Sequence, residues 1–198
     1  FNVFNDFNHE SAATKYHVYR FIRHWLTEYK VDGFRWDLSK GFTQVNSGSN
    51  VGAWGNYDAS RIAIWKNYYD SMQAVAPGSY CILEHFGGDQ EEIELANYGM
   101  LLWNNLNYES NQNTMGYINN STLYRAYAPY KGYTKLGLIS YAESHDEERL
   151  MYKNINFGFT NSNYDVKSLN IGLQRMEALN ALMLLIPGAK MYWQFGEL

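Results

Sequence analysis

The stretch that decides the fold is residues 31–37, VDGFRWD. This short apolar run has the character of a strand, and residues two apart in a strand point to the same face. We therefore expect Arg35 and Asp37 to stand side by side where the strand runs into its loop. A neighbouring cation keeps a carboxylate ionised, and α/β enzymes place nucleophiles or bases at strand carboxyl ends. A structural Arg-Asp pair that caps the strand explains this stretch equally well.

Two further apolar runs also end in acids. Residues 80–88, YCILEHFGG, carry Glu84 ahead of a Gly-rich loop, and residues 136–147, LGLISYAESHDE, end in the pair His145-Asp146 followed by another acid. Helical patterns separate the three runs, as in an alternating α/β chain with a parallel sheet. Three such strand ends indicate one shared constellation of acids better than three unrelated ion pairs.

In order, these runs resemble three sequence signatures of the α-amylase family of glycoside hydrolases. Residues 4–8, FNDFN, are similar to a fourth, the Leu-Pro-Asp-Leu-Asn signature that precedes the Arg-x-Asp strand. The resemblance implies a partial (β/α)₈ TIM barrel, with about strands 4 to 8 and their helices in this chain. It implies a retaining glycosidase that cleaves α-glucosidic bonds in starch-like glucans or maltooligosaccharides. In this family Asp37 would be the nucleophile, Glu84 the proton donor and Asp146 a third carboxylate that stabilises the transition state.

Two alternatives to hydrolysis remain open. The same three acids serve debranching, branching and transglycosylating members of the family, in which loops set the outcome. An alternative from another class is a catalytically silent sugar-binding homologue. The intact acids favour an enzyme, because a binding module needs no nucleophile, acid and stabiliser together.

The residues themselves favour different roles for the first two acids. Asp37 lies beside Arg35 and is the carboxylate best held ionised. Glu84 ends an apolar strand with no cation adjacent in sequence, so its pKa is the better candidate to be raised. For the third acid the sequence alone does not choose, since three glutamates crowd Asp146, and only the His-Asp match to the family selects it; they are Glu143, Glu147 and Glu148.

The resemblance also implies residues that bind substrate. Arg35 would orient the nucleophile, His145 would donate to the sugar ring at the cleaved position, and Lys40 would reach a sugar hydroxyl. Lys40-Gly41 departs from the Lys-His of many starch-degrading members, which removes an imidazole contact on the leaving-group side. His85 either contacts sugar or merely ends its strand.

A calcium ion is a possible cofactor by the same resemblance. Asn8 and Gly41 hold two of the positions that supply its ligands in relatives. Asn8 is neutral where many relatives have Asp, and hard cations generally take six or more oxygens, several of them charged.

Composition restricts the class of protein. The chain has 198 residues, a net charge of −4 and a pI near 5.7, with no basic stripe for nucleic acid. It has no run of about 18 apolar residues, so we expect no membrane span. Cys81 is the single cysteine, which excludes an internal disulfide and leaves the compartment undecided. The 17% aromatic content suits stacking on the faces of an α-glucan substrate.

The chain is organised as alternating helices and strands. We expect strands at the three runs above and at residues 100–103 and 189–195, and a long loop over residues 41–57. Glu91 and Glu92 are expected to form a solvated helix start. A complete barrel needs roughly 250 residues, so we interpret residues 1–198 as a fragment of one catalytic domain. We expect this chain alone to be inactive or weakly active, and either to self-associate or to be a piece of a larger protein. Helical periodicity predicts helices over residues 11–29, 58–76, 89–97, 107–131 with a loop near 119–120, and 168–186.

Overall fold

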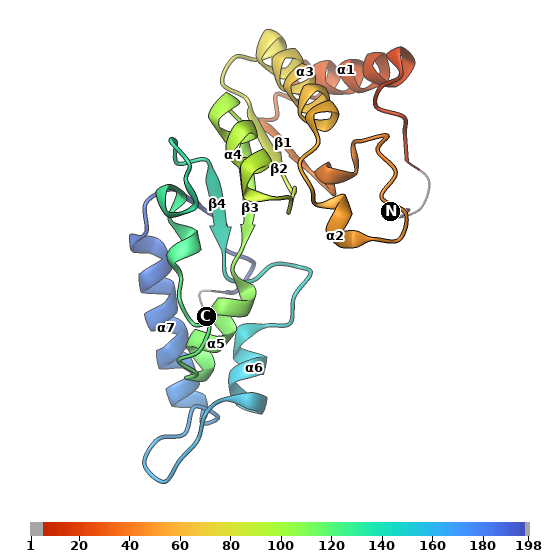
Figure 1. Cartoon of the computed structure of the whole chain (residues 1–198). Helices are drawn as coiled ribbons and strands as arrows, with labels where there is room; N and C mark the ends of the chain where they lie inside the picture. Colours follow the sequence, from red (N-terminus) through yellow and green to blue (C-terminus); the bar gives the residue numbers. More distant parts are fainter. Residues whose placement is uncertain (1–5, 197–198) are drawn as a thin grey trace. The chain divides into compact units, whose positions relative to one another are not determined.

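The computed structural model describes residues 6–196, so Phe4 and Asn5 of the FNDFN signature lie outside the described residues. Five strands follow one another along the chain and in one sheet, in the order β1-β2-β3-β4-β5, with helices between them (Figure 1). The pairs β1-β2, β2-β3 and β4-β5 are parallel. This confirms the predicted α/β class with a parallel sheet, consistent with a partial TIM-barrel-like fold. The strands are β1 (Gly33–Trp36), β2 (Tyr80–Leu83), β3 (Leu101–Asn105), β4 (Leu138–Tyr141) and β5 (Ala189–Lys190).

Seven α-helices accompany these strands in the described part of the chain. Four of the five predicted helices correspond to α1, α3, α4 and α7, with ends shifted by at most two residues. None of the helices within residues 6–196 is both long enough and apolar enough to cross a bilayer. The helices are α1 (Ala12–Thr27), α2 (Val51–Trp54), α3 (Ala59–Val75), α4 (Asp89–Tyr98), α5 (Asn107–Met115), α6 (Leu150–Phe157) and α7 (Leu169–Leu185).

Several predicted elements differ from the structure. The region 107–131 is helical only in α5, followed by two short 3₁₀ turns, Tyr124–Ala126 and Ala128–Lys131. The last strand, β5, is two residues long instead of seven. Two helices were not predicted, the four-residue α2 inside the expected long loop and α6 after β4.

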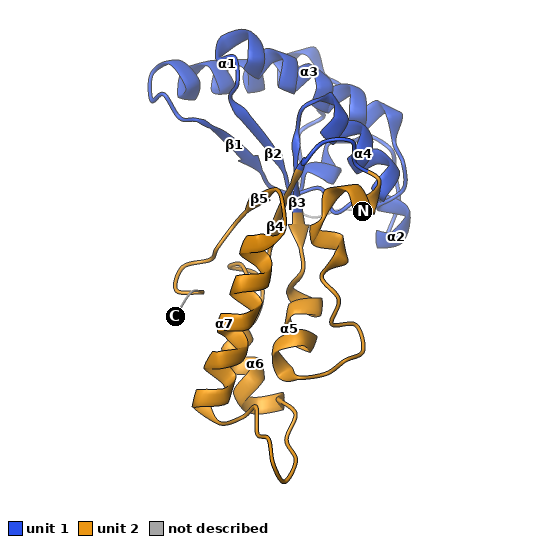
Figure 2. Cartoon of the chain, turned by 90° about the vertical axis from the view of Figure 1, so that its left-hand side faces the viewer, with its two compact units in different colours: residues 1–103, 133–137 blue, residues 104–132, 138–198 orange. Residues whose placement is uncertain are grey.

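The chain divides into two compact units, coloured separately in Figure 2, and the boundary falls within β3. That residues 1–198 belong to one barrel domain stays a prediction. Unit 1 comprises Phe1–Trp103 with Tyr133–Gly137, and unit 2 comprises Asn104–Gly132 with Leu138–Leu198.

The core of unit 1 is built around aromatic rings. The ring of Trp65, on α3, stacks on Phe42 at 4.4 Å between centroids and meets Trp36 of β1 edge-on at 5.5 Å. Tyr68 completes this group, and its hydroxyl contacts the ring nitrogen of the buried His9 at 2.9 Å. Many rings of this aromatic-rich chain therefore serve the core.

The core of unit 2 lies among α5, α6 and α7, which pack pairwise. Its buried apolar side chains include Leu106, Leu150 and Leu179. On α7, Met176 is buried in this core, whereas Leu182 is exposed. The buried stripe of this helix is therefore narrower than its apolar composition suggests.

Gly33 is required where β1 approaches β2. A Cβ at this position would lie 2.1 Å from the carbonyl oxygen of Tyr80, its partner across the strand pair. We predict that Gly33→Ala lowers the free energy of unfolding by about 2 kcal/mol or more, because the strands must separate to admit the methyl group. Urea denaturation of the 198-residue chain measures this. Gly55→Ala is the matched control, since its Cβ would make only ordinary contacts, and equal stability of the two variants would contradict the prediction.

Candidate active site

Asp37 and Glu84 follow the last residues of two neighbouring parallel strands. Trp36 of β1 lies opposite Leu83 of β2, and the backbone N–H of Glu84 donates to the carbonyl of Trp36 at 3.0 Å. Parallel register puts both carboxyl ends at one edge of the sheet. The two acids, 47 positions apart in sequence, are therefore brought to adjacent positions.

Arg35 lies between the two acids. One terminal nitrogen of its guanidinium is 2.5 Å from Oδ1 of Asp37, and the other is 2.9 Å from Oε1 of Glu84. Its guanidinium carbon lies 5.3 Å from the centroid of the Trp103 ring, a cation–π contact. The expected pairing of Arg35 with Asp37 is present, and the same cation also reaches Glu84, which sequence spacing did not suggest.

The environments of the two carboxyl groups differ. The side chain of Asp37 is 71% exposed and that of Glu84 is 8% exposed. Burial raises the pKa of Glu84, and the nearby Asp37 raises it further; the N–H of Leu38, which donates to Oε2 at 2.8 Å, and the Arg35 guanidinium oppose the shift without cancelling it. The site thus holds, on either side of one cation, an exposed acid and a buried acid whose pKa is raised.

A groove opens beside Asp37 and is lined by aromatic, apolar and polar side chains. Lys40 lies near it, with its ammonium 4.7 Å from the centroid of Trp54 and donating to the carbonyl of Phe86 at 3.3 Å. Burial lowers the pKa of Lys40. The groove is lined by Asp6, His9, Asp37, Leu38, Gly41, Phe42, Thr43, Val45 and Trp54.

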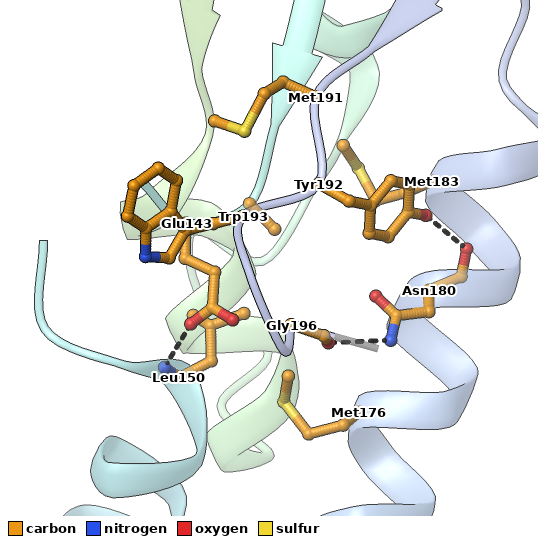
Figure 3. Close-up of a pocket in the computed structure, with 10 residues that line it drawn as sticks. Glu143, Leu150, Met176, Asn180, Met183, Met191, Tyr192, Trp193 and Gly196 are labelled. Atoms are coloured by element: carbon orange, nitrogen blue, oxygen red, sulfur yellow. Dashed lines mark hydrogen bonds between the residues drawn. The ribbon is translucent and has the colours of Figure 1, made fainter. Parts of the chain in front are cut away.

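In unit 2 the acids after β4 have distinct surroundings. Glu143 is buried, its Oε2 accepts the backbone N–H of Leu150 at 2.9 Å, and it lines a pocket with methionines and aromatic residues (Figure 3). Glu147 accepts from the backbone N–H of Ser144 at 2.9 Å and from the Asn105 amide. Both glutamates are thus engaged by the fold.

Asp146 and His145 remain accessible in unit 2. Nε2 of His145 lies 3.4 Å from Oδ1 of Asp146, and the two side chains are 50% and 59% exposed. The imidazole is 5.6 Å from the Trp193 ring. The exposed Glu148 is the other acid of this segment without a described structural bond. Local geometry therefore favours Asp146 over Glu143 and Glu147 as an acid available to a ligand.

This fold is similar to that of Amy13B from Eubacterium rectale. The match has a TM-score of 0.67 at 16% sequence identity and covers 96% of this chain. The chain spans about a third of the matched protein, 35% of its length. No protein-family model matches the sequence, and no curated protein sequence matches it. The likeness to Amy13B, whose name marks it as an amylase, is thus one of fold.

His85, one of the residues expected to bind substrate, is buried away from solvent. Its ring is fully buried, with Nδ1 2.9 Å from Oγ of Ser39 and Nε2 2.8 Å from Oε1 of Glu91. Because protein groups occupy both nitrogens, the imidazole cannot also bond a sugar. Of the two roles that the sequence left open, the geometry favours the structural one.

The two residues expected to bind calcium each accept a backbone hydrogen bond. The side-chain oxygen of Asn8 accepts the backbone N–H of Glu10 at 2.9 Å, and the carbonyl of Gly41 accepts that of Thr43 at 2.8 Å. Within residues 6–196, no group of three or more His, Cys, Asp or Glu side chains is arranged to hold a metal. Calcium binding by Asn8 and Gly41 stays a prediction.

The expectation of a solvated helix start at Glu91 and Glu92 is wrong. Both side chains are buried. Glu91 pairs with Arg61 at 2.6 Å, and Glu92 accepts the backbone N–H of Gly87 at 3.1 Å and the hydroxyl of Tyr133 at 3.1 Å. The acids of this helix start are tied to the loop after β2, a role for which the sequence carries no local signal.

The raised pKa of Glu84 has a measurable consequence for stability. A carboxyl whose pKa is higher in the folded than in the unfolded state destabilises the fold once it ionises. We predict that Glu84→Gln is more stable than the parent chain at neutral pH, and that the difference shrinks as pH falls through the folded-state pKa and vanishes below about pH 4. Thermal unfolding across this range measures the effect.

Glu94→Gln is the control of opposite sign. Lys66 and Tyr57, bonded to its carboxylate, lower the pKa of Glu94. Its neutralisation should therefore destabilise the chain at neutral pH, with a difference that disappears as pH falls through the lowered pKa. A Glu84→Gln variant that is less stable than the parent at pH 7 would show that the buried carboxyl is stabilised by its charge.

Proposed function

We propose that this chain carries the catalytic acids of a retaining glycoside hydrolase that cleaves α-glucosidic bonds in starch-like glucans or maltooligosaccharides. The observation that supports this most directly is Arg35, which contacts both an exposed Asp37 and a buried Glu84. A single guanidinium touches two carboxyl groups only if they are close neighbours. Retaining enzymes place their two carboxyl groups roughly 5–5.5 Å apart, and two acids that share one guanidinium are compatible with that spacing.

In the first step the two acids act on opposite atoms of the scissile bond. The Asp37 carboxylate attacks the anomeric carbon while the bond from that carbon to the leaving oxygen breaks. Glu84 transfers its proton to the leaving oxygen, which departs as the hydroxyl of the shortened glucan. The raised pKa of Glu84 suits this acid role.

In the second step Glu84 acts as a base. Its carboxylate takes a proton from water, and the water oxygen attacks the anomeric carbon and displaces the Asp37 carboxylate. Two inversions at one carbon retain its configuration. Arg35 positions Asp37 in both steps, since a terminal nitrogen of its guanidinium lies 2.5 Å from Oδ1 of Asp37.

Asp146 and His145 are proposed to bind the sugar at the cleaved position. Asp146 would accept sugar hydroxyls and stabilise the oxocarbenium-like transition state, and His145 would donate to the same ring. Support comes from their accessibility beside Trp193 and from the structural engagement of Glu143 and Glu147. Lys40 is proposed as a contact on the leaving-group side.

Activity of acid variants tests this proposal. On soluble starch and an aryl maltooligosaccharide, we expect Asp37→Asn, Glu84→Gln and Asp146→Asn each to lose about a thousandfold or more in kcat/KM. Azide should restore turnover of the Asp37 variant with inversion at the anomeric carbon. An activated aryl leaving group should spare the Glu84 variant, because it needs no proton. Product analysis by chromatography distinguishes hydrolysis from transfer or debranching.

The assay is run on the 198-residue chain and on any longer protein that contains it. Asp70→Asn is a matched control, since Asp70 bonds only Tyr98 on the surface of unit 1. An active parent whose Asp37→Asn variant keeps full activity would overturn the nucleophile assignment. A folded parent that binds maltooligosaccharide without turnover would instead favour the sugar-binding alternative.

A further inference from the structure

A network of buried polar side chains lies behind the two strand ends of unit 1. Arg61 on α3 and Glu91 on α4 form a two-point ion pair, with distances of 2.6 Å from Nε to Oε1 and 2.8 Å from a terminal nitrogen to Oε2. Glu91 then contacts His85, and His85 contacts the hydroxyl of Ser39. Arg61 is 1% exposed and the other three are fully buried. These four residues are called the buried network below.

The buried network has the order of a Ser-His-acid hydrolase triad but not its accessibility. Since Ser39 is completely buried, no substrate reaches its hydroxyl, and it is not a nucleophile. The buried network therefore has a structural role. Burying an Arg and a Glu is costly unless they are paired and hydrogen bonded. The contacts of Arg61 and Glu91 therefore indicate which part of the structure they stabilise.

Those contacts converge on the loops that follow β1 and β2. The guanidinium of Arg61 donates to the carbonyl of Lys40 at 2.9 Å, and to those of Trp54 and Asn56. The carbonyl of Ser39 accepts from the indole of Trp65 at 2.9 Å. Residues 38–41 are called the catalytic loop below. This loop is thus held by hydrogen bonds at three of its groups: the Ser39 hydroxyl, the Ser39 carbonyl and the Lys40 carbonyl.

The catalytic loop in turn holds Glu84 at two points. The N–H of Leu38 donates to its carboxylate at 2.8 Å, and the N–H of Ser39 donates to its backbone carbonyl at 3.0 Å. Leu38 makes its contact from a left-handed conformation, with φ of 44°. This conformation is unfavourable for residues other than glycine. It persists only if surrounding contacts impose it, and the buried network supplies such contacts.

We propose that the buried network is a positioning unit that holds the catalytic loop against Glu84, the proposed acid. Its catalytic consequence rests on the proposed function, but its structural consequence does not. Loss of the unit should free the catalytic loop, so that Leu38 relaxes and its N–H leaves the Glu84 carboxylate. None of these four side chains then needs to touch substrate in order to affect turnover.

Amide hydrogen exchange of the Leu38 and Ser39 N–H groups tests the proposal without a substrate. In the folded 198-residue chain, we expect Glu91→Gln to speed exchange at both amides by about tenfold or more, because the closed state of the loop is less populated. Glu94→Gln lies one turn further on α4, has no bond to the loop, and should leave both amides unchanged.

A second variant covers the case that Glu91→Gln does not fold. Ser39→Ala removes only the hydroxyl that meets His85 and leaves the backbone groups that bind Glu84 and Trp65. It should speed Leu38 exchange by at least about threefold at nearly unchanged melting temperature. Ser71→Ala is its control, since that hydroxyl donates to the Asn67 carbonyl within α3. Exchange in Ser39→Ala equal to that in Ser71→Ala would overturn the proposal.

Kinetics adds a readout that a merely structural loss would not give. If the parent is an active glycosidase, both network variants should lower kcat by about tenfold with KM within about twofold, because a displaced acid affects the transition state more than binding. The loss should be smaller for a substrate with an activated leaving group. Faster exchange together with a longer parent protein that is folded but inactive would uphold the positioning unit and refute the proposed function. Equal kcat losses for both substrates would refute action through Glu84.

Discussion

The parallel pairing of β1 with β2 is the constraint on which the candidate site depends. Backbone register places Trp36 opposite Leu83, and the residue after each is an acid. No side-chain interaction is needed to bring Asp37 and Glu84 together, since the ladder already does so. The pairing is close enough that position 33 admits only glycine. The close pairing of the two strands at Gly33 thus helps to fix the positions of the acids at their carboxyl ends.

Part of this arrangement was readable in the sequence. Apolar runs that end in acids identified β1, β2 and β4, and the two-residue period placed Arg35 on the side of Asp37. The rest depends on groups distant in sequence. Glu91 looks like an ordinary acidic helix start, but its buried carboxylate is bonded by Arg61, from another helix, and by His85. Likewise α6 begins where Glu143, seven residues earlier, accepts the N–H of Leu150. Local sequence propensity predicts neither of these interactions, because each depends on a residue outside the helix concerned.

The expected rise in the pKa of Glu84 is present, but for a different reason from the one first given. No cation is adjacent to Glu84 in sequence, but in the structure a guanidinium nitrogen of Arg35 lies 2.9 Å from Oε1 of Glu84. Its pKa is raised nevertheless, since burial outweighs the guanidinium and the Leu38 N–H. The same cation thus faces two carboxyl groups of very different exposure. The catalytic loop bonds the buried one through the N–H of Leu38.

Sharing one cation between two acids also suits the charge changes of the proposed reaction. Before the first step a protonated Glu84 and an ionised Asp37 leave one negative charge for Arg35 to balance. After it, Asp37 is esterified and neutral while Glu84 has lost its proton, so one negative charge remains but on the other residue. A guanidinium that already contacts both oxygen atoms balances either state with little movement. Such preorganisation avoids the reorganisation that water would undergo around a moving charge.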